Sequence, residues 1–63
     1  MNQEYELHIN YSNGERLYDS TYKYRSAAVK EGRTMVRNKQ VTYSDTPKLE
    51  AVATSFYVRK VTY

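Results

Sequence analysis

Residues 5–24 read YELHINYSNGERLYDSTYKY, and this stretch decides the fold. Apolar or aromatic residues stand at every second position from residue 5 to residue 11, which is typical of a half-buried β-strand. The Asn13-Gly14 pair that follows favours a two-residue type I′ turn, because both central positions of that turn need positive φ. Residues 16–24 are rich in Tyr and Thr and predict a second strand. The stretch therefore predicts a β-hairpin.

A two-residue loop also fixes which side chains meet across the hairpin, because it makes Ser12 and Glu15 the closing pair. Counting back from that pair, the expected partners on one face are Ile9 with Tyr18, Leu7 with Ser20, and Tyr5 with Tyr22. On the other face we expect His8 opposite Asp19, which is ordinarily a surface contact.

Residues 27–38 predict a helix, with Ser26 in a good N-cap position. The small and apolar residues of this segment fall within an arc of about 120° on a helical wheel; they are Ala28, Val29, Gly32, Met35 and Val36. A glycine inside a helix costs about 1 kcal/mol relative to alanine. Gly32 at the centre of the arc is therefore either a tolerated weak spot or a close approach to the sheet, with a tyrosine ring over the gap.

The C-terminal part begins ambiguously. Residues 41–43 fit a short strand or an extended loop, and Ser44-Asp45-Thr46-Pro47 fits a turn or loop. Residues 53–63 are rich in β-formers and predict the last strand. We expect Phe56 and Val58 to face inward and Tyr57 and Arg59 outward, although Val61 and Tyr63 fit the opposite phase. A bulge between the two halves would reconcile them.

These elements predict a single α+β domain over residues 1–63, in ββαβ order. The last strand is expected antiparallel to the first in a three-stranded sheet of order second-first-last, with one helix on one face. A fourth short strand at residues 41–43 is the main variant. The residues expected to be mostly buried are Leu7, Ile9, Tyr18, Tyr22, Val29, Val36 and Phe56.

Composition removes several function classes. The chain has no cysteine and a single histidine, His8, so neither a zinc site nor a disulfide is expected, and no cofactor-binding motif is present. Nucleophile, base and orienting group do not converge in any pattern, which argues against an enzyme. No apolar run approaches the roughly 20 residues needed to span a bilayer. The polar, acidic start is unlike a secretory signal, so we expect a cytoplasmic protein.

Charge is distributed unevenly along the chain. Residues 1–22 carry a net charge of −3, residues 23–39 carry +5, and residues 40–63 carry +1. Most of the positive charge therefore lies on and around the predicted helix. The residues we expect to contact a partner or nucleic acid are Lys23, Arg25, Lys30, Arg33, Arg37, Tyr57 and Arg59.

Two functions fit this pattern. The first is a non-enzymatic binding or regulatory protein that contacts a protein partner, or a second copy of itself, through the open sheet face or a sheet edge. The alternative is a sequence-independent nucleic-acid-binding module that uses the basic helix face. In size, single amphipathic helix and lack of catalytic residues, the chain is similar to the small accessory proteins of phages and mobile elements.

Overall fold

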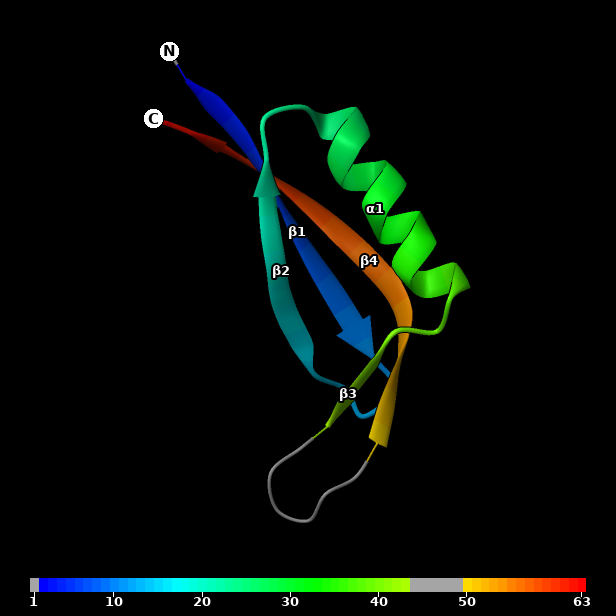
Figure 1. Cartoon of the computed structure of the whole chain (residues 1–63). Helices are drawn as coiled ribbons and strands as arrows, with labels where there is room; N and C mark the ends of the chain where they lie inside the picture. The colour runs from blue at the N-terminus through cyan, green and yellow to red at the C-terminus, as the bar shows by residue number, and fades with distance from the viewer. Residues whose placement is uncertain (1, 44–49) are drawn as a thin grey trace.

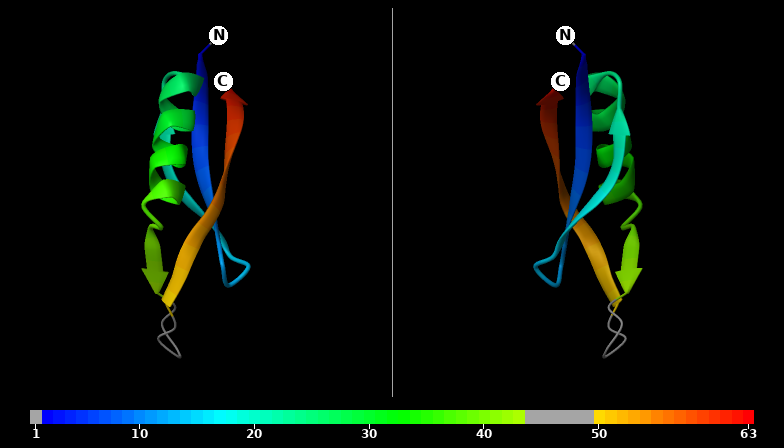
Figure 2. Two further views of the ribbon diagram at one scale, coloured as in Figure 1. Left: turned by 90° about the vertical axis from the view of Figure 1, so that its right-hand side faces the viewer. Right: turned by 90° about the vertical axis from the view of Figure 1, so that its left-hand side faces the viewer.

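The fold consists of two layers, an antiparallel β-sheet and one helix that covers one of its faces (Figures 1 and 2). A computed structural model describes residues 2–43 and 50–63 of the 63-residue chain. Its elements are β1 (Gln3–Tyr11), β2 (Arg16–Tyr22), α1 (Arg25–Arg37), β3 (Val41–Tyr43) and β4 (Glu50–Thr62). The predicted turn at residues 44–47 lies outside the described residues.

The strands lie in the order β2-β1-β4-β3, and every pair of neighbours is antiparallel. The α+β class and the antiparallel placement of the last strand beside the first are confirmed. The order is ββαββ, so the three-stranded ββαβ arrangement is wrong, and its variant with a fourth short strand at residues 41–43 is confirmed. β4 begins at Glu50 and not at Ala53, and its first residues are the ones that pair with β3.

Helix α1 begins at Arg25, and two residues connect it to the end of β2 at Tyr22. The N-cap residue is Tyr24 and makes no side-chain cap, so the prediction of Ser26 at this position is wrong. The Tyr24 carbonyl instead accepts the backbone N–H groups of Ala27 and Ala28 at 3.2 and 3.3 Å. The C-terminal end is closed by the backbone alone, since Gln40 N donates to Met35 O at 2.9 Å. This is a Schellman arrangement, in which Lys39 occupies the left-handed position with φ of 52°.

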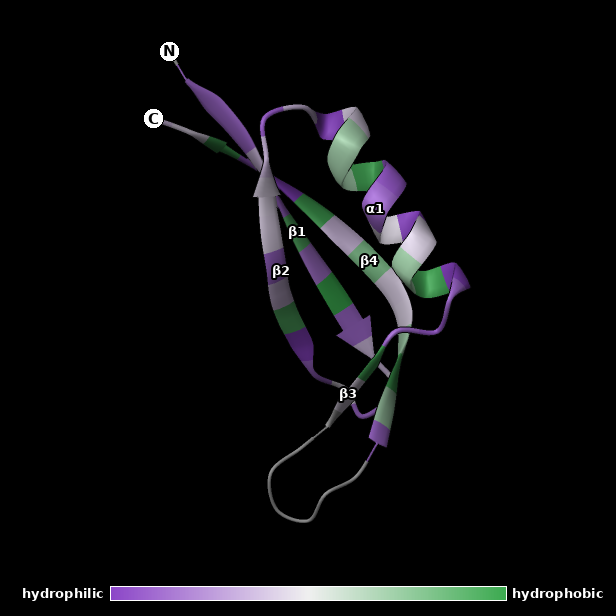
Figure 3. Cartoon of the chain, viewed as in Figure 1, coloured by the Kyte–Doolittle hydropathy of each residue, from purple (hydrophilic) through white to green (hydrophobic). Residues whose placement is uncertain are grey.

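The helix packs closest to the sheet at Gly32. A Cβ added there would lie 2.6 Å from two ring carbons of Phe56 and 3.0 Å from Leu7 Cδ1. Close approach at this glycine is therefore confirmed, although the ring over the gap belongs to Phe56 and not to a tyrosine. Ala28, one turn earlier, is also buried. The hydrophobic positions of α1 and β1 are visible in Figure 3.

Most of the expected core is present. Leu7 and Ile9 are almost fully buried, and Tyr22, Val36 and Phe56 are partly buried against the same cluster. Val29 is half-buried. Tyr18 was expected inside and is 56% exposed, which corrects the prediction. The other buried members of the core are Tyr11, Ala28, Ala51 and Ala53.

The exposure of Tyr18 comes from the hairpin register. Tyr5↔Tyr22 and Leu7↔Ser20 pair as predicted, but the next pairs are His8↔Tyr18 and Ile9↔Leu17. The extra residue, Asp19, forms a β-bulge that places Tyr18 on the face opposite α1.

The turn itself also differs from the predicted type. Tyr11 N donates to Glu15 O at 2.8 Å, and Gly14 N donates to Tyr11 O at 3.0 Å. The loop therefore has three residues (Ser12, Asn13 and Gly14), of which Gly14 has positive φ, 89°, and Asn13 does not. A β-turn followed by a left-handed residue is a common hairpin loop. Its extra residue shifts the register by one, and the Asp19 bulge shifts it back.

The facing of β4 follows the predicted phase. Tyr57 pairs with His8 and Arg59 with Glu6 on the face away from α1, while Phe56 packs under the helix. The predicted bulge between the two halves of the strand is wrong. The register of β4 shifts only near Ala53, and it stays regular through the pair formed by Val61 and Glu4.

Candidate functional site

Three aromatic rings stand side by side on the open face, the face of β2, β1 and β4 that lies away from α1. Tyr18 from β2, His8 from β1 and Tyr57 from β4 form this ring row, because the register pairs His8 with both tyrosines. The ring centroids of His8 and Tyr18 are 5.7 Å apart in an edge-to-face arrangement. Those of His8 and Tyr57 are 6.1 Å apart and tilted. The ring row therefore crosses the three strands.

Arginine and amide groups flank the ring row on the side toward the hairpin turn. The guanidinium carbon of Arg16 lies 5.1 Å from the centroid of the Tyr57 ring, within the range of a cation–π contact. Arg16 Nε donates to Asn10 Oδ1 at 2.7 Å. Asn10 Nδ2 in turn donates to Ser55 Oγ at 3.0 Å. This chain of bonds holds Arg16 beside the ring row.

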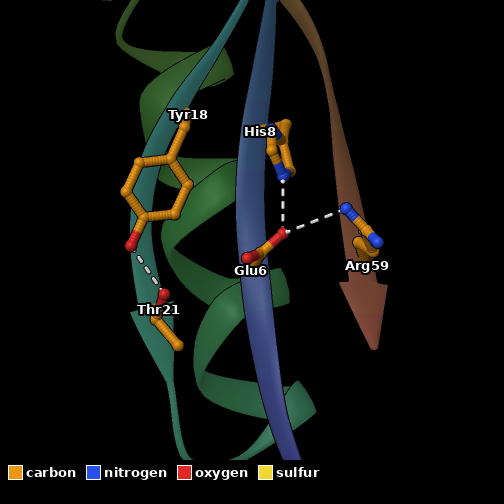
Figure 4. Close-up of polar contacts among 5 residues, drawn as sticks. All are labelled: Glu6, His8, Tyr18, Thr21 and Arg59. Atoms are coloured by element: carbon orange, nitrogen blue, oxygen red, sulfur yellow. Dashed lines mark hydrogen bonds and ion pairs between the residues drawn. The ribbon is translucent and has the colours of Figure 1, made fainter. Parts of the chain in front are cut away.

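A second set of polar contacts flanks the ring row on the other side (Figure 4). Glu6 Oε1 lies 3.2 Å from His8 Nε2 and 3.8 Å from Arg59 Nη1. The Tyr18 hydroxyl hydrogen-bonds to Thr21 Oγ1 at 2.6 Å. The Glu6 carboxylate thus contacts two partners. The Tyr18 ring is held by its attachment to the backbone at one end and by the hydrogen bond of its hydroxyl at the other.

The open face is both accessible and held in place. Tyr18 is 56% exposed and Tyr57 is 45% exposed. The nine residues that make up the three rows are Arg16, Asn10, Ser55, Tyr18, His8, Tyr57, Thr21, Glu6 and Arg59. None of them is aliphatic. Such a surface can stack against flat rings and contact anions, because arginines flank the rings on both sides.

At the far end of the open face, Glu4 acts on a tyrosine. The Glu4 carboxylate is the largest cause of a raised pKa at Tyr63, and the Glu6 carboxylate raises this pKa further. Negative charge disfavours the phenolate of Tyr63. Negative charge therefore gathers at this end of the open face, with Glu6 3.8 Å from Arg59.

The structure gathers part of the predicted contact set on the helix. Arg25, Lys30, Arg33 and Arg37 line one shallow groove along α1, together with Ser26, Val29 and Thr34. All four cations are exposed. Lys23 lies apart from them, in a groove with the start of β1 and the end of β2. Tyr57 and Arg59 lie on the opposite side of the sheet from this helix stripe, as their predicted outward facing implied, so the predicted residues form two surfaces.

Sequence reasoning placed His8 on the open face but missed two other members, Tyr18 and Arg16. His8 was expected beside Asp19, but the bulge turns Asp19 away, where its carboxylate accepts a bond from Ser20 Oγ at 2.8 Å. His8 contacts Glu6 instead. The alternation of β1 did place His8 on the open face; no sequence signal placed Tyr18 there, because the bulge was not foreseen.

The described residues contain no group of three or more His, Cys, Asp or Glu side chains that could hold a metal ion. Within residues 2–43 and 50–63, no helix is long and apolar enough to cross a membrane. Comparison with protein-family models, curated proteins and solved structures finds no match to this chain. The function must therefore be argued from the two surfaces themselves.

Proposed function

We propose that this protein is a non-enzymatic binding module that holds single-stranded nucleic acid on the open face of its sheet. The ring row of Tyr18, His8 and Tyr57 is the observation that carries the proposal. Every base has a flat π-face, so stacking on aromatic side chains binds a single strand with little regard to sequence. The two exposed rings, Tyr18 and Tyr57, offer places for two bases, and the Arg16 guanidinium over Tyr57 adds a further plane for stacking.

The charges around the ring row fit a phosphate backbone. Arg16 and Arg59 lie on opposite sides of the ring row. A nucleic-acid strand that lies along the ring row would therefore pass both guanidinium groups. Glu6 would repel phosphate if it were free, but its carboxylate faces both His8 and Arg59. The Arg59 side chain is still 62% exposed and accessible to a ligand.

A protein partner is the second candidate for this surface. Tyrosine and arginine are enriched at protein–protein interfaces as well, and the aliphatic Val61 lies on the same face, opposite Glu4. Contact with a protein partner, or with a second copy of the chain, stays a prediction and is the hypothesis to return to if nucleic acid does not bind.

A direct test is fluorescence anisotropy with labelled 12-nucleotide single-stranded DNA and RNA of mixed sequence, at low salt. Stacking is worth about 1–3 kcal/mol per base, and about 1.4 kcal/mol is tenfold in affinity. We therefore expect Tyr57→Ala and Tyr18→Ala each to weaken binding about tenfold or more. Tyr57→Phe keeps the ring and should keep most of the affinity.

Tyr24 supplies a matched control. It is 64% exposed but precedes α1 and makes no side-chain cap, so Tyr24→Ala removes a comparable ring outside the open face. This variant should bind like the wild type. Equal losses in Tyr24→Ala and Tyr57→Ala, or no binding by the wild type at low salt, would show that the open face is not a single-strand site.

A further inference from the structure

We propose that the helix stripe of Arg25, Lys30, Arg33 and Arg37 is a second site, which binds the phosphate backbone of a nucleic-acid duplex. This site goes beyond the single-strand function and stands on separate residues. The two surfaces lie on opposite sides of the sheet, so one molecule can hold a single strand and a duplex at once. Only this bridging step rests on the function proposed above.

The stripe has a length that suits a duplex backbone. Arg25 and Arg37 are the first and last residues of the 13-residue helix, and a rise of about 1.5 Å per residue separates them by roughly 18 Å. Phosphates on one strand recur about every 3.4 Å along a duplex axis. The stripe therefore spans the axial length of roughly five base pairs, about half a helical turn, and can reach the phosphates that face it along that length.

The cations of the stripe are available to a ligand. In the described part of the chain, the ion pairs are those that Glu6 makes with His8 and Arg59, and neither involves α1. Arg25, Lys30, Arg33 and Arg37 are exposed and line the same groove. Three of the four are arginines, whose planar fork matches phosphate oxygens.

The surroundings of the stripe favour nucleic acid over a lipid surface. A helix that lies on a membrane needs a free apolar face, whereas the apolar side of α1 is used against the sheet at Ala28 and Gly32. The groove also contains Ser26 and Thr34, and its one apolar member, Val29, is half-buried. Contact through charge alone suits a continuous polyanion.

The test uses the whole chain and a labelled 30-base-pair duplex of mixed sequence, closed by a hairpin at each end. Four phosphate contacts predict a slope of log affinity against log salt of about −3 to −4. Arg33→Glu/Arg37→Glu should abolish duplex binding at 50 mM salt. Because both side chains are exposed, circular dichroism should match the wild type, and stability should fall by only about 0.3–1 kcal/mol, the effect of a carboxylate in the last turn of the helix. The milder Arg33→Gln/Arg37→Gln should reduce the slope to about −2.

A charge-matched control separates the stripe from net charge. Lys39 and Lys60 are exposed and lie outside the groove, so Lys39→Glu/Lys60→Glu carries the same net charge as the arginine reversal. It should keep most of the duplex affinity. Equal losses in the two variants, or a reversal that still binds duplex, would overturn the site. So would displacement of the duplex by polyglutamate at equal charge concentration, because the stripe would then fit an acidic protein.

Bridging has its own readout. Immobilised duplex should retain a labelled single strand only when the protein is present; Arg33→Glu/Arg37→Glu should abolish this retention, and Tyr57→Ala should weaken it about tenfold or more. Tyr57→Ala should still bind duplex, whereas the arginine reversal should still bind single strand. If no single strand binds but the duplex result holds, the function proposed for the open face fails and the helix site stands.

Discussion

The two faces of this sheet differ in how their side chains are held. On the covered face, α1 approaches so closely at Gly32 that a single added carbon would lie 2.6 Å from the Phe56 ring. On the open face, the side chains are held by polar contacts to one another, such as the 2.7 Å bond from Arg16 to Asn10. The same three strands carry both arrangements, because successive residues of a strand point to opposite faces.

The difference separates the residues expected to set stability from those expected to set the proposed binding. A covered face that is close-packed resists any change of volume. An open face whose exposed rings are already oriented loses less side-chain entropy when a ligand binds. Substitutions on the covered face should therefore change folding, and substitutions on the open face should change binding.

The largest effect is expected at Gly32 on the covered face. Gly32→Leu should destabilise the fold by about 3 kcal/mol, because the added atoms overlap Phe56 and Leu7 and the core must deform. Gly32→Ala is the more informative variant, since helix propensity alone would make it about 1 kcal/mol more stable. We expect it to be less stable than the wild type in urea unfolding.

Two variants check that this cost comes from packing. Thr34→Leu adds an aliphatic side chain to an exposed position of the same helix and should stay within about 0.5 kcal/mol of the wild type. Gly32→Ala/Phe56→Leu makes room at the contact and should recover part of the loss. A Gly32→Ala protein more stable than the wild type would mean that the two layers do not meet there.

An intermediate effect is expected at high pH, through a tyrosine of the covered face. Burial, with a smaller contribution from Asp19, raises the pKa of Tyr11 above its ordinary value of 10.0. The folded state therefore holds the Tyr11 proton more tightly than the unfolded state does. The contribution of this proton to the free energy of unfolding is fully present below about pH 10 and is lost as the pH rises through the folded pKa. Urea unfolding from pH 8 to 11 should show this fall.

The matched variants are Tyr11→Phe and Tyr57→Phe. The first removes a titrating group from the covered face, so its stability should fall less between pH 9 and 11. The second changes an exposed ring of the open face and leaves Tyr11 in place, so it should follow the wild type. Identical pH profiles for all three proteins would contradict the coupling of Tyr11 to folding.

The covered face could largely be predicted from the sequence. Alternation in β1 identified Leu7 and Ile9, and the helical wheel identified Gly32, because burial imposes a regular period on apolar residues. β3 could only be offered as a variant, since three residues carry too little pattern. The N-cap was misplaced because backbone bonds from Tyr24, and no side chain, begin α1.

The open face could be predicted only in part. Tyr57 and Arg59 were expected there, yet the ring row depends on Tyr18, which alternation alone places inside. The sequence carries no signal for the bulge, because Asp19 is as compatible with a regular exposed position of a strand as with a bulged one. The helix cations were identified together, and the expected facing of the last strand already separated them from Tyr57 and Arg59.

The smallest effect is expected in the hairpin loop, whose length decides which face Tyr18 joins. In the observed three-residue loop only Gly14 has positive φ, so Gly14→Ala should cost about 1 kcal/mol. Asn13 has ordinary φ, and its Oδ1 accepts a bond from Glu15 N at 3.0 Å. Asn13→Ala should therefore cost only about 0.5 kcal/mol, the worth of one exposed hydrogen bond.

The comparison of Asn13→Ala with Asn13→Gly distinguishes the observed loop from the two-residue type I′ turn. Both variants lose the bond to Glu15, so they differ only in backbone preference. Where φ is negative, glycine is the worse residue, because it adds entropy to the unfolded chain, and Asn13→Ala should be more stable by about 0.5 kcal/mol. In a type I′ turn the position needs positive φ and the order reverses. Proton NMR completes the test: contacts between the rings of His8 and Tyr18 place Tyr18 in the ring row, whereas contacts between Tyr18 and Ile9 would return it to the covered face.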